Sequence, residues 1–507
     1  MRHTVHLVAA LGLLAGVAPA ESQRKPAAPG LEAAIDPVVK QMMTEWHIPG
    51  LAVGVVKNGR IILQKGYGYR DVDKQLPVTP QTLMAIGSNT KSFTVVLMGL
   101  LVDQGKLAWD TPVRTYLPTF QLYDEYAGKT MTPRDLVNHR SGLPRHDFLW
   151  YGRRYTRPEL VDRLRYLEPT HTFRETWQYQ NLMFATAGHL AETLSGQPWD
   201  RMIRDQIFTP LGMTRSLPDT HGFEQADDHS VPYAWRNGPI TAIPVRSLDA
   251  AGPAGSIVSS VEDMLKYAQF RMAHGRNQSG LRLSVANEDG MQSPQMVVPG
   301  AGYWPGFDLV TYGLGLVVAS YRGHRVVLHG GSIDGFISQM SWLPDDSIGV
   351  IVLSNRGDPN PVPTLVVQSI YDRLLGLTPI DYGAKQKQTD LAEARTADST
   401  EAALRAGQKK GTQPSHELSA YAGAYQHPGY GTALVKLVNG HLEVVLDDLV
   451  APTTHYHYDT FELGDAKSLV PLKGLMSFGT NAKGEIDRLM LPLEPTIAPI
   501  VFTRSDR

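Results

Sequence analysis

A serine and a lysine stand three residues apart in the run 87–91 (GSNTK). Residues at this spacing share one face of a helix, with roughly 5 to 6 Å between their Cβ atoms. A serine hydroxyl is a weak nucleophile, and a deprotonated lysine amine beside it can remove its proton. The pair therefore indicates nucleophilic catalysis by Ser88, with Lys91 as a candidate base.

An apolar run follows this pair and predicts a buried helix. Residues 93–102 (FTVVLMGLLV) are almost entirely apolar, and Gly105 is a typical helix stop. Ser88 is then expected at the helix N-terminus, where backbone N–H groups and the helix dipole favour negative charge on an alkoxide or oxyanion. The same spacing recurs at Ser22 and Lys25, in a polar segment with no apolar helix behind it. Context therefore distinguishes Ser88.

Two further short motifs follow Ser88 along the chain. The first is Tyr179-x-Asn181, which lies between an aromatic-rich stretch and a helical pattern. The second is His329-x-Gly331, at the end of the β-rich run 326–328. Together with the serine and lysine they form three elements in one order.

With these motifs the chain resembles the serine β-lactamase and penicillin-recognising peptidase superfamily, whose fingerprint is Ser-x-x-Lys, then Ser or Tyr-x-Asn, then Lys or His-x-Gly. The tyrosine and histidine variants are similar to class C β-lactamases, D-specific carboxypeptidases, D-aminopeptidases and related esterases, and differ from class A enzymes. Supporting stretches are a hairpin pattern around Asn58-Gly59 and the segments 132–144, 252–256 and 334–336. The resemblance covers roughly residues 30 to 378.

This resemblance implies an α+β fold for residues 30–378. An antiparallel sheet flanked by helices would carry an inserted all-helical subdomain, and Ser88 and Tyr179 would line the cleft between the two. The hydrophobic periodicity by itself indicates only a mixed α and β hydrolase with a β-rich tail.

The resemblance also implies acyl transfer through a covalent intermediate on Ser88. Lys91, kept neutral by burial and nearby positive groups, is the first candidate for the base and Tyr179 is the second. Which of the two acts first stays open at this point. Asn181 is expected to hold the substrate amide and the lysine through its acceptor and donor.

The third motif is expected to bind the substrate. The resemblance assigns the oxyanion hole to the backbone N–H groups of Ser88 and Ser332. Gly330 and Gly331 would let a substrate strand approach the backbone closely. His329 would contribute electrostatics or a hydrogen bond to a substrate carboxylate, or else it packs at a strand end.

The C-terminal part of the chain has a different composition. Residues 379–415 are rich in Lys, Gln, Glu, Ala and Thr and predict a linker with some helix. Residues 416–507 carry hairpin signals at Asn439-Gly440 and 481–484, predict a small antiparallel barrel, and resemble the lipocalin-like C-terminal domain of some related hydrolases. We expect a cap or specificity module without a part in the chemistry, because every catalytic candidate lies at or before Ser332.

The first residues indicate export. Residues 1–20 combine a basic start, an apolar core and a small-x-small cleavage pattern, which predicts a signal peptide and a periplasmic or secreted protein. The apolar core is too short for a stable membrane span. The alternative, a buried N-terminal helix, is disfavoured because His6 is the only polar residue in 5–17. The chain has no cysteine, which excludes disulfides and thiol catalysis.

Composition and motifs indicate few partners. The chain has 507 residues, too many for a single core, with 48 Lys and Arg against 50 Asp and Glu and a net charge of −2. This balance lacks the basic field that nucleic-acid binding requires.

No phosphate loop or dinucleotide motif occurs, and His455 and His457 lack a third and fourth metal ligand, so no cofactor or metal is expected. A homo-oligomer stays open, as does whether the C-terminal domain caps its own or a partner's site.

The substrate is the least determined property, because one fold hosts many activities. A small molecule or a peptide is expected, with an amide bond of an unusual or D-residue peptide as the first choice. A carboxylesterase or class C-like β-lactamase is the first alternative. A penicillin-binding or sensor protein that acylates without turnover is the second.

Overall fold

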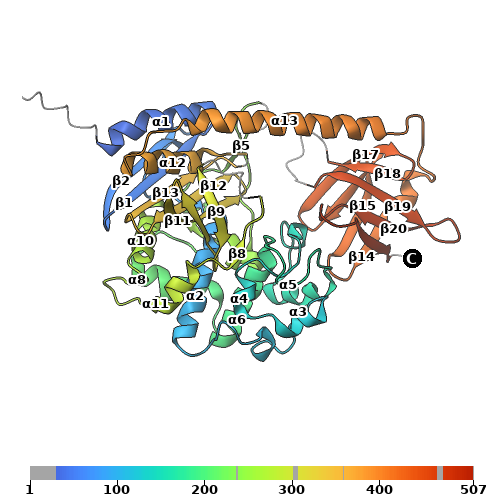
Figure 1. The fold of residues 1–507 in the computed structure, drawn as a ribbon. Coiled ribbons are helices and arrows are strands. Elements are labelled where there is room, and N and C mark those ends of the chain that lie inside the picture. The colour runs from blue at the N-terminus through green and yellow to red at the C-terminus, as the bar shows by residue number, and fades with distance from the viewer. Residues whose placement is uncertain (1–29, 236–237, 301–305, 358, 465–471, 506–507) are drawn as a thin grey trace, which may run out of the picture.

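The computed structural model describes residues 30–505 except 236–237, 301–305, 358 and 465–471. The expected signal peptide, 1–20, lies outside the described residues. The α+β prediction is confirmed in both of its parts, a helix-flanked antiparallel sheet with a helical subdomain and a C-terminal β-barrel (Figure 1).

Within the described residues, nine strands form one antiparallel sheet, in the order β3, β2, β1, β13, β12, β11, β10, β9, β8. The predicted hairpin is β1 and β2, and its turn residues Asn58 and Gly59 take positive φ angles of 51° and 73°, as a two-residue hairpin requires. The bounds of the nine strands are β1 (Gly50–Lys57), β2 (Arg60–Asp71), β3 (Leu76–Pro77), β8 (Met296–Val297), β9 (Phe307–Tyr312), β10 (Val317–Tyr321), β11 (His324–Ile333), β12 (Phe336–Leu343) and β13 (Ile348–Ser354).

Helices bury both faces of the central strands. Val53 packs in one core with α1 (Leu31–Glu45) and α12 (Val362–Leu374), whereas its neighbour Ala52 belongs to the core that includes α10 (Val261–Met272). Side chains alternate between the two faces of a strand. Because each face is covered, these strands are almost continuously apolar in sequence, and β1 and β13 are buried along nearly their whole length.

A helical subdomain lies beside the sheet, and α2 is buried within it (Figure 1). Its helices and turns are η1 (Gly87–Asn89), α2 (Thr90–Asp103), η2 (Val113–Thr115), α3 (Glu125–Thr130), α4 (Pro133–Leu136), η3 (Asp147–Leu149), α5 (Arg157–Arg163), η4 (Leu164–Tyr166), α6 (Asn181–Ser195), α7 (Trp199–Ile203), η5 (Arg204–Phe208), α8 (Thr209–Leu211), η6 (Asp249–Ala251), α9 (Gly252–Gly255) and α11 (Val285–Met291). Two short ladders pair β4 (Met84–Ala85) with β7 (Val258–Ser259) and β5 (Tyr233–Ala234) with β6 (Thr241–Ala242).

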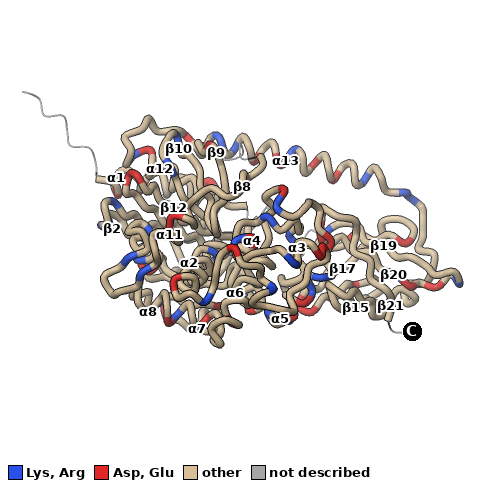
Figure 2. Tube along the Cα trace, turned by 60° about the horizontal axis from the view of Figure 1, so that its bottom comes forward, with Lys and Arg blue, Asp and Glu red and all other residues tan. Residues whose placement is uncertain are grey.

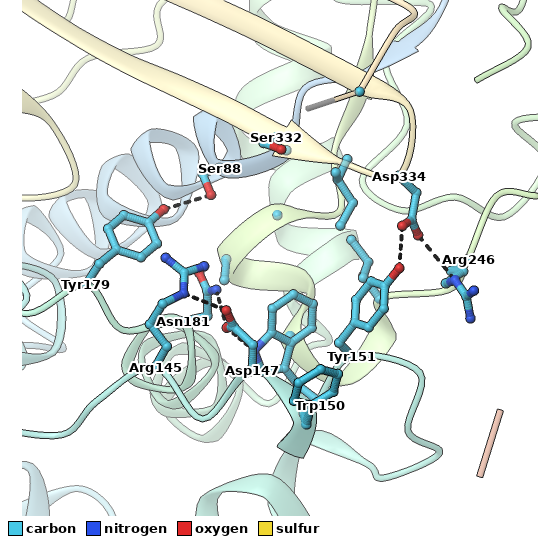
Figure 3. Close-up of a pocket in the computed structure, with 18 of the residues that line it drawn as sticks. Ser88, Arg145, Asp147, Trp150, Tyr151, Tyr179, Asn181, Arg246, Ser332 and Asp334 are labelled. Carbon is cyan, nitrogen blue, oxygen red and sulfur yellow. Dashed lines mark hydrogen bonds and ion pairs between the residues drawn. The ribbon is translucent and has the colours of Figure 1, made fainter. Parts of the chain in front are cut away.

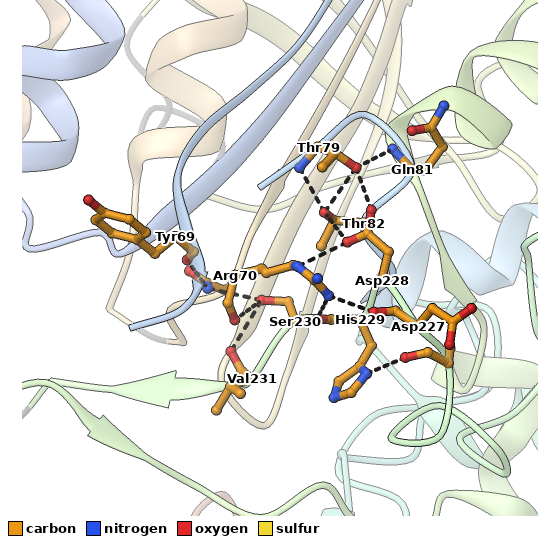
Figure 4. A network of polar contacts seen from close by, with 12 residues as sticks. Tyr69, Arg70, Thr79, Gln81, Thr82, Asp227, Asp228, His229, Ser230 and Val231 are labelled. Atoms are coloured by element: carbon orange, nitrogen blue, oxygen red, sulfur yellow. Dashed lines mark hydrogen bonds and ion pairs between the residues drawn. The ribbon is translucent and has the colours of Figure 1, made fainter. Parts of the chain in front are cut away.

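Polar contacts anchor the segment that leads into Ser88 (Figure 4). The Asp228 carboxylate accepts a hydrogen bond from the Thr82 hydroxyl at 2.7 Å and pairs with Arg70 at 3.3 Å. The backbone N–H of Leu83 donates to the Asp228 carbonyl at 2.8 Å. The chain therefore enters η1 from a fixed position.

One long helix, α13 (Tyr382–Gly407), runs from the sheet to the barrel (Figure 1). It lies within the predicted linker and is 26 residues long, because Ala, Glu, Lys, Arg and Gln are strong helix formers. At one end Trp46 donates a hydrogen bond to Asp390 at 3.2 Å. At the other end Arg405 pairs with Glu462 of the barrel.

Among the described residues, eight strands close a C-terminal barrel, which follows the short helix α14 (Leu418–Tyr421). Alternate residues point inward, as Leu442, Val444 and Leu446 do in β16. The likeness to lipocalins stays a prediction. The strands are β14 (Gly423–His427), β15 (Gly431–Val438), β16 (His441–Leu446), β17 (Leu449–His457), β18 (Thr460–Leu463), β19 (Gly474–Thr480), β20 (Ile486–Leu491) and β21 (Ile500–Arg504).

The barrel docks on the helical subdomain. A side chain at Gly152 would meet Leu449 at 2.5 Å, so the two parts pack without a gap there. The buried Arg153 guanidinium pairs with Asp447 at 2.8 Å. One hydrophobic cluster continues from the core around α2 into the barrel. The barrel is therefore held by packing as well as by α13.

The charges are distributed in both signs over the molecule (Figure 2). Both blue and red positions occur along α13 and over the helical subdomain, in keeping with the net charge of −2. Across the described residues, no helix is both long and apolar enough to span a bilayer.

Candidate active site

The structure brings Ser88 and Tyr179 together at the junction of the sheet and the helical subdomain (Figure 3), and Lys91 lies within hydrogen-bond distance of Ser88. Ser88 lies in η1, directly before α2, so Lys91 is on the first turn of that helix. The Lys91 Nζ atom is 3.0 Å from Ser88 Oγ. The Tyr179 hydroxyl donates a hydrogen bond to the same Oγ at 2.7 Å. The serine oxygen thus lies between an amine and a phenol.

The partners of the Lys91 amine indicate which atom can accept the serine proton. Besides Ser88, Nζ contacts Asn181 Oδ1 at 2.7 Å and the Ala254 carbonyl at 2.8 Å. Both oxygens only accept hydrogen bonds, so two N–H groups of the amine are directed at them. A neutral amine then has its lone pair left for the Ser88 hydroxyl.

Burial supports this neutral form. Lys91 is fully buried, and this desolvation lowers its pKa well below the ordinary value of a lysine. The positive charge of Arg145 lowers the pKa further, whereas the negative charge of Asp147 raises it. The amine is therefore a base that is ready to accept a proton.

The same burial has the opposite consequence for Tyr179. It raises the pKa of the phenol above its ordinary value, although the hydrogen bond to Ser88 and the charge of Arg145 lower it. The phenol therefore keeps its proton and acts as a donor to Ser88. Of the two candidate bases, Lys91 has the protonation state that the first step needs.

Asn181 and two residues that the sequence analysis missed complete this cluster. Asn181 Nδ2 donates to Asp147 Oδ1 at 3.1 Å, and Asp147 pairs with Arg145 at 2.5 Å. The Arg145 guanidinium lies 4.9 Å from the centre of the Tyr179 ring. The sequence signal was that Arg145 directly follows the family-like stretch 132–144 and that Asp147 lies two residues further on. The turn 145–147 thus supplies the charged side chains that act on Lys91 and Tyr179, the two candidate bases.

His329 does not reach the cavity, contrary to its expected contact with a substrate carboxylate. Its Nδ1 donates to the Gly330 carbonyl at 2.6 Å, and its Nε2 lies 3.0 Å from the Tyr312 hydroxyl. Burial lowers the pKa of His329 to about 3. A neutral imidazole with both nitrogens in use supplies neither a positive charge nor a spare donor. The histidine packs within β11 and not at a strand end, because the strand continues past the run 326–328 to Ile333.

The two glycines of this motif also serve the fold more than the substrate. A Cβ atom at Gly331 would lie 1.9 Å from the Ile86 carbonyl oxygen, whereas one at Gly330 would have ordinary contacts. The absence of a side chain at Gly331 therefore lets the backbone at Ile86, two residues before Ser88, pack closely against β11. Neither glycine lines the cavity. Ser332 does line it together with Ser88. The oxyanion role of these two residues stays a prediction.

A cavity of about 960 Å³ opens over Ser88, and three of the parts that line it come from the helical subdomain, the sheet and the barrel. The helical subdomain contributes aromatic side chains such as Phe148 and Trp150, and the sheet contributes the end of β11. The third wall is the barrel segment 493–496 (LEPT), between β20 and β21. The barrel therefore covers the active site of its own chain.

A polar cluster lies in the cavity wall beyond Ser332 (Figure 3). The Tyr151 hydroxyl donates to Asp334 Oδ1 at 2.5 Å, and Arg246 faces the other carboxylate oxygen at 3.7 Å. Desolvation raises the pKa of Asp334. The cavity thus combines an apolar interior with charged groups on both sides, as ligand pockets commonly do.

Comparison with known proteins identifies the family. Residues 35–372 match the family model described as Beta-lactamase. The chain belongs to the β-lactamase family. The expected resemblance is thereby confirmed for most of the chain. In this β-lactamase-family protein, residues 407–504 match a second model, described as a domain of unknown function, DUF3471.

Two of the relatives are named hydrolases. The Unguisins hydrolase ungD' of Aspergillus campestris is 30% identical over 413 residues, which are 78% of this chain and 75% of that protein. The Unguisins hydrolase ungD of Aspergillus violaceofuscus is 29% identical over 465 residues, 83% of this chain and 78% of that protein. This β-lactamase-family chain is therefore a hydrolase by fold and by relatedness.

Two solved structures share the fold. The octameric penicillin-binding protein homologue from Pyrococcus abyssi has a TM-score of 0.60 at 22% identity, over 93% of this chain and 99% of that one. The D-stereospecific amidohydrolase from Streptomyces sp. has a TM-score of 0.56 at 23% identity, over 65% and 97%. The first match spans almost the whole β-lactamase-family chain, barrel included.

Proposed function

We propose that this protein is a serine hydrolase that cleaves amide bonds through an acyl-enzyme on Ser88, with peptides of unusual or D-configured residues as substrates. The observation that carries the proposal is the position of Ser88 Oγ, 3.0 Å from Lys91 Nζ and 2.7 Å from the Tyr179 hydroxyl. Nucleophile, base and proton donor are thus within hydrogen-bond reach of one another.

The first chemical step transfers the Ser88 proton to Lys91 as Oγ attacks the substrate carbonyl carbon. The negative charge that forms on the carbonyl oxygen is stabilised by backbone N–H groups near the start of α2. Tyr179 then donates its proton to the leaving nitrogen, and the C–N bond breaks. The phenolate regains a proton from the Lys91 ammonium, which lies 4.8 Å from the ring centre.

In the second half, water replaces the amine. Its proton goes to the neutral Lys91 as its oxygen attacks the ester carbonyl. The bond between the carbonyl carbon and Ser88 Oγ then breaks, Oγ takes this proton from the Lys91 ammonium at 3.0 Å, and the acid product is released. The residues of the cluster therefore end in their starting protonation states, and no cofactor is required for the balance.

The name of one structural neighbour supports an amide substrate. Two relatives are hydrolases of unguisins, and a structural neighbour is a D-stereospecific amidohydrolase. The cavity of about 960 Å³ extends from Ser88 to Asp334 and to the barrel, which leaves room for several residues of a peptide. Cleavage of such peptides outside the cytoplasm, after removal of residues 1–20, is part of the proposal.

Self-association is a further part of the proposal. It is supported by the octameric state of the Pyrococcus neighbour, which the chain matches over 93% of its length.

A substrate panel tests the proposal. Purified protein is offered p-nitroanilides of D- and L-residue peptides, a matched ester and a chromogenic cephalosporin, with Ser88→Ala as the control. We expect the D-peptide anilides to give the highest kcat/KM and the alanine variant to give none. Turnover of the ester or the cephalosporin alone would refute the amide substrate. An adduct that forms without product release would indicate a binding protein.

A further inference from the structure

One carboxylate of the barrel is buried against the helical subdomain. Glu494 lies in the segment 493–496 and is only 4% exposed. Its Oε2 accepts a hydrogen bond from the backbone N–H of His146 at 2.8 Å. Its Oε1 accepts from the backbone and the hydroxyl of Thr496, at 3.2 and 2.8 Å. Both oxygens are therefore used within the chain, and Glu494 serves the fold of the site more than substrate binding.

The residue that Glu494 holds has an unusual backbone conformation. His146 is left-handed, with φ 47° and ψ 41°, which is unfavourable for a residue with a side chain and persists only where the surroundings enforce it. Its ring Nδ1 lies 2.7 Å from the hydroxyl of Tyr430, a second barrel residue. The barrel therefore fixes both the backbone and the ring of His146.

The neighbours of His146 in sequence belong to the catalytic cluster. Arg145 stacks over the Tyr179 ring, and Asp147 accepts the hydrogen bond from Asn181. Asn181 in turn accepts from Lys91. An unbroken series of contacts thus runs from the barrel to the proposed base.

We propose that Glu494 is a positioning residue, through which docking of the barrel sets the turn 145–147 and thereby the placement of Arg145 and Asp147 around Tyr179 and Asn181. The inference rests on the proposed function, because it assigns Glu494 to the Ser88 chemistry. The barrel is then part of the catalytic unit, beyond its role as a cover of the cavity.

The charges around Lys91 determine whether displacement of the turn 145–147 raises or lowers its pKa. Arg145 lowers the pKa of Lys91 and Asp147 raises it, with Arg145 the larger of the two effects. The other groups that face the amine are the protonated Tyr179 and two histidines, His139 and His329, which burial keeps neutral. Displacement of the turn therefore raises the pKa of Lys91. Acylation, which needs the neutral amine, then declines at a higher pH.

The experiment measures the rate of Ser88 labelling by a fluorophosphonate against pH in the full-length protein. Glu494→Ala should lower the rate by roughly 10- to 100-fold and move the acid limb of the profile to higher pH. Glu494→Gln keeps an oxygen for the His146 N–H and should restore most of the rate. The matched control is Asp448→Ala, which removes an exposed pair with Arg154 at the same interface and should stay within about twofold of wild type.

Each outcome bears on one claim. If the wild type is not labelled at Ser88, the proposed function is wrong. If it is labelled, and Glu494→Ala has the same rate and the same acid limb, the positioning role is wrong. If Glu494→Ala does not fold, Tyr430→Phe decides, because it removes only the contact with the His146 ring. A smaller shift of the acid limb in the same direction supports the inference, and an unchanged profile contradicts it.

Discussion

Replacing Lys91 with alanine should slow the acylation of Ser88 by about 10²- to 10⁴-fold, the usual contribution of a general base. The reason is that, of the two groups hydrogen-bonded to Ser88 Oγ in the described part of the chain, the Lys91 amine is the base, since burial raises the pKa of Tyr179 and keeps it protonated. The measurement is the pre-steady-state rate with an activated amide.

Lys91→Arg is the matched control for this prediction. Arginine has a side chain of similar length and carries the positive charge of a protonated lysine, but it cannot be deprotonated in a protein. We expect it to be as slow as the alanine variant. A rate within about threefold of wild type, small on the scale of general-base catalysis, would mean that residue 91 acts through its charge and not as a base.

The pH dependence follows from the same assignment. Burial and Arg145 lower the pKa of Lys91, so the amine is neutral above that lowered value and protonated below it. The wild-type acylation rate should therefore fall as pH decreases through the pKa of Lys91, and this acid limb should be absent from the residual activity of Lys91→Ala.

Removing the Tyr179 hydroxyl should affect poor leaving groups most. Tyr179→Phe keeps the ring on which Arg145 stacks but has no proton for the leaving nitrogen. We expect acylation by an anilide or alkyl amide to slow by about 10²-fold or more. A p-nitrophenyl ester, whose leaving group needs no proton, should lose much less. The measurement compares acylation rates for an amide and an ester with the same acyl group.

Tyr371→Phe is the control for loss of a buried phenol. Its hydroxyl lies 2.6 Å from Ser341 Oγ on the opposite face of the sheet, within the core that contains α12. This variant should have wild-type rates with both substrates. Equal losses for the amide and the ester in Tyr179→Phe would contradict a role in leaving-group protonation and favour a purely structural one.

The pattern of residue types along short stretches of the sequence predicted the helix that follows Ser88 and the first hairpin of the sheet. The apolar run after Ser88 became α2, and the Asn58-Gly59 dipeptide became the turn of the first hairpin. Both results depend on interactions between residues close in sequence, which amino-acid type determines well. The motif residues Tyr179 and Asn181 were found because their types and order match a family pattern.

Contacts between distant segments were not predictable in this way. Arg145 and Asp147 acquire their importance from the fold, which places the turn 145–147 against Tyr179 and Asn181. The approach of Glu494 to His146 joins positions 348 residues apart. No periodicity or spacing encodes such a contact, because it depends on how the barrel docks.

His329 shows why a motif residue needs its surroundings. The sequence places a histidine directly after the β-rich run 326–328, where a charged imidazole at a strand end could meet a substrate. Burial instead lowers the pKa of His329 and keeps it neutral, with the Tyr312 hydroxyl 3.0 Å from its Nε2. The charge of a titratable side chain is set by desolvation and partners, which only the folded structure supplies.

The central claim is that Ser88 is the nucleophile, and the intact mass of the protein after exposure to a fluorophosphonate or a penicillin tests it most directly. We predict a single adduct, mapped by peptide mass to the segment containing Ser88, with the second Ser-x-x-Lys serine, Ser22, unlabelled in the same sample. Ser88→Ala should give no adduct. An adduct that persists in Ser88→Ala would contradict the assignment of Ser88 and the mechanism built on it.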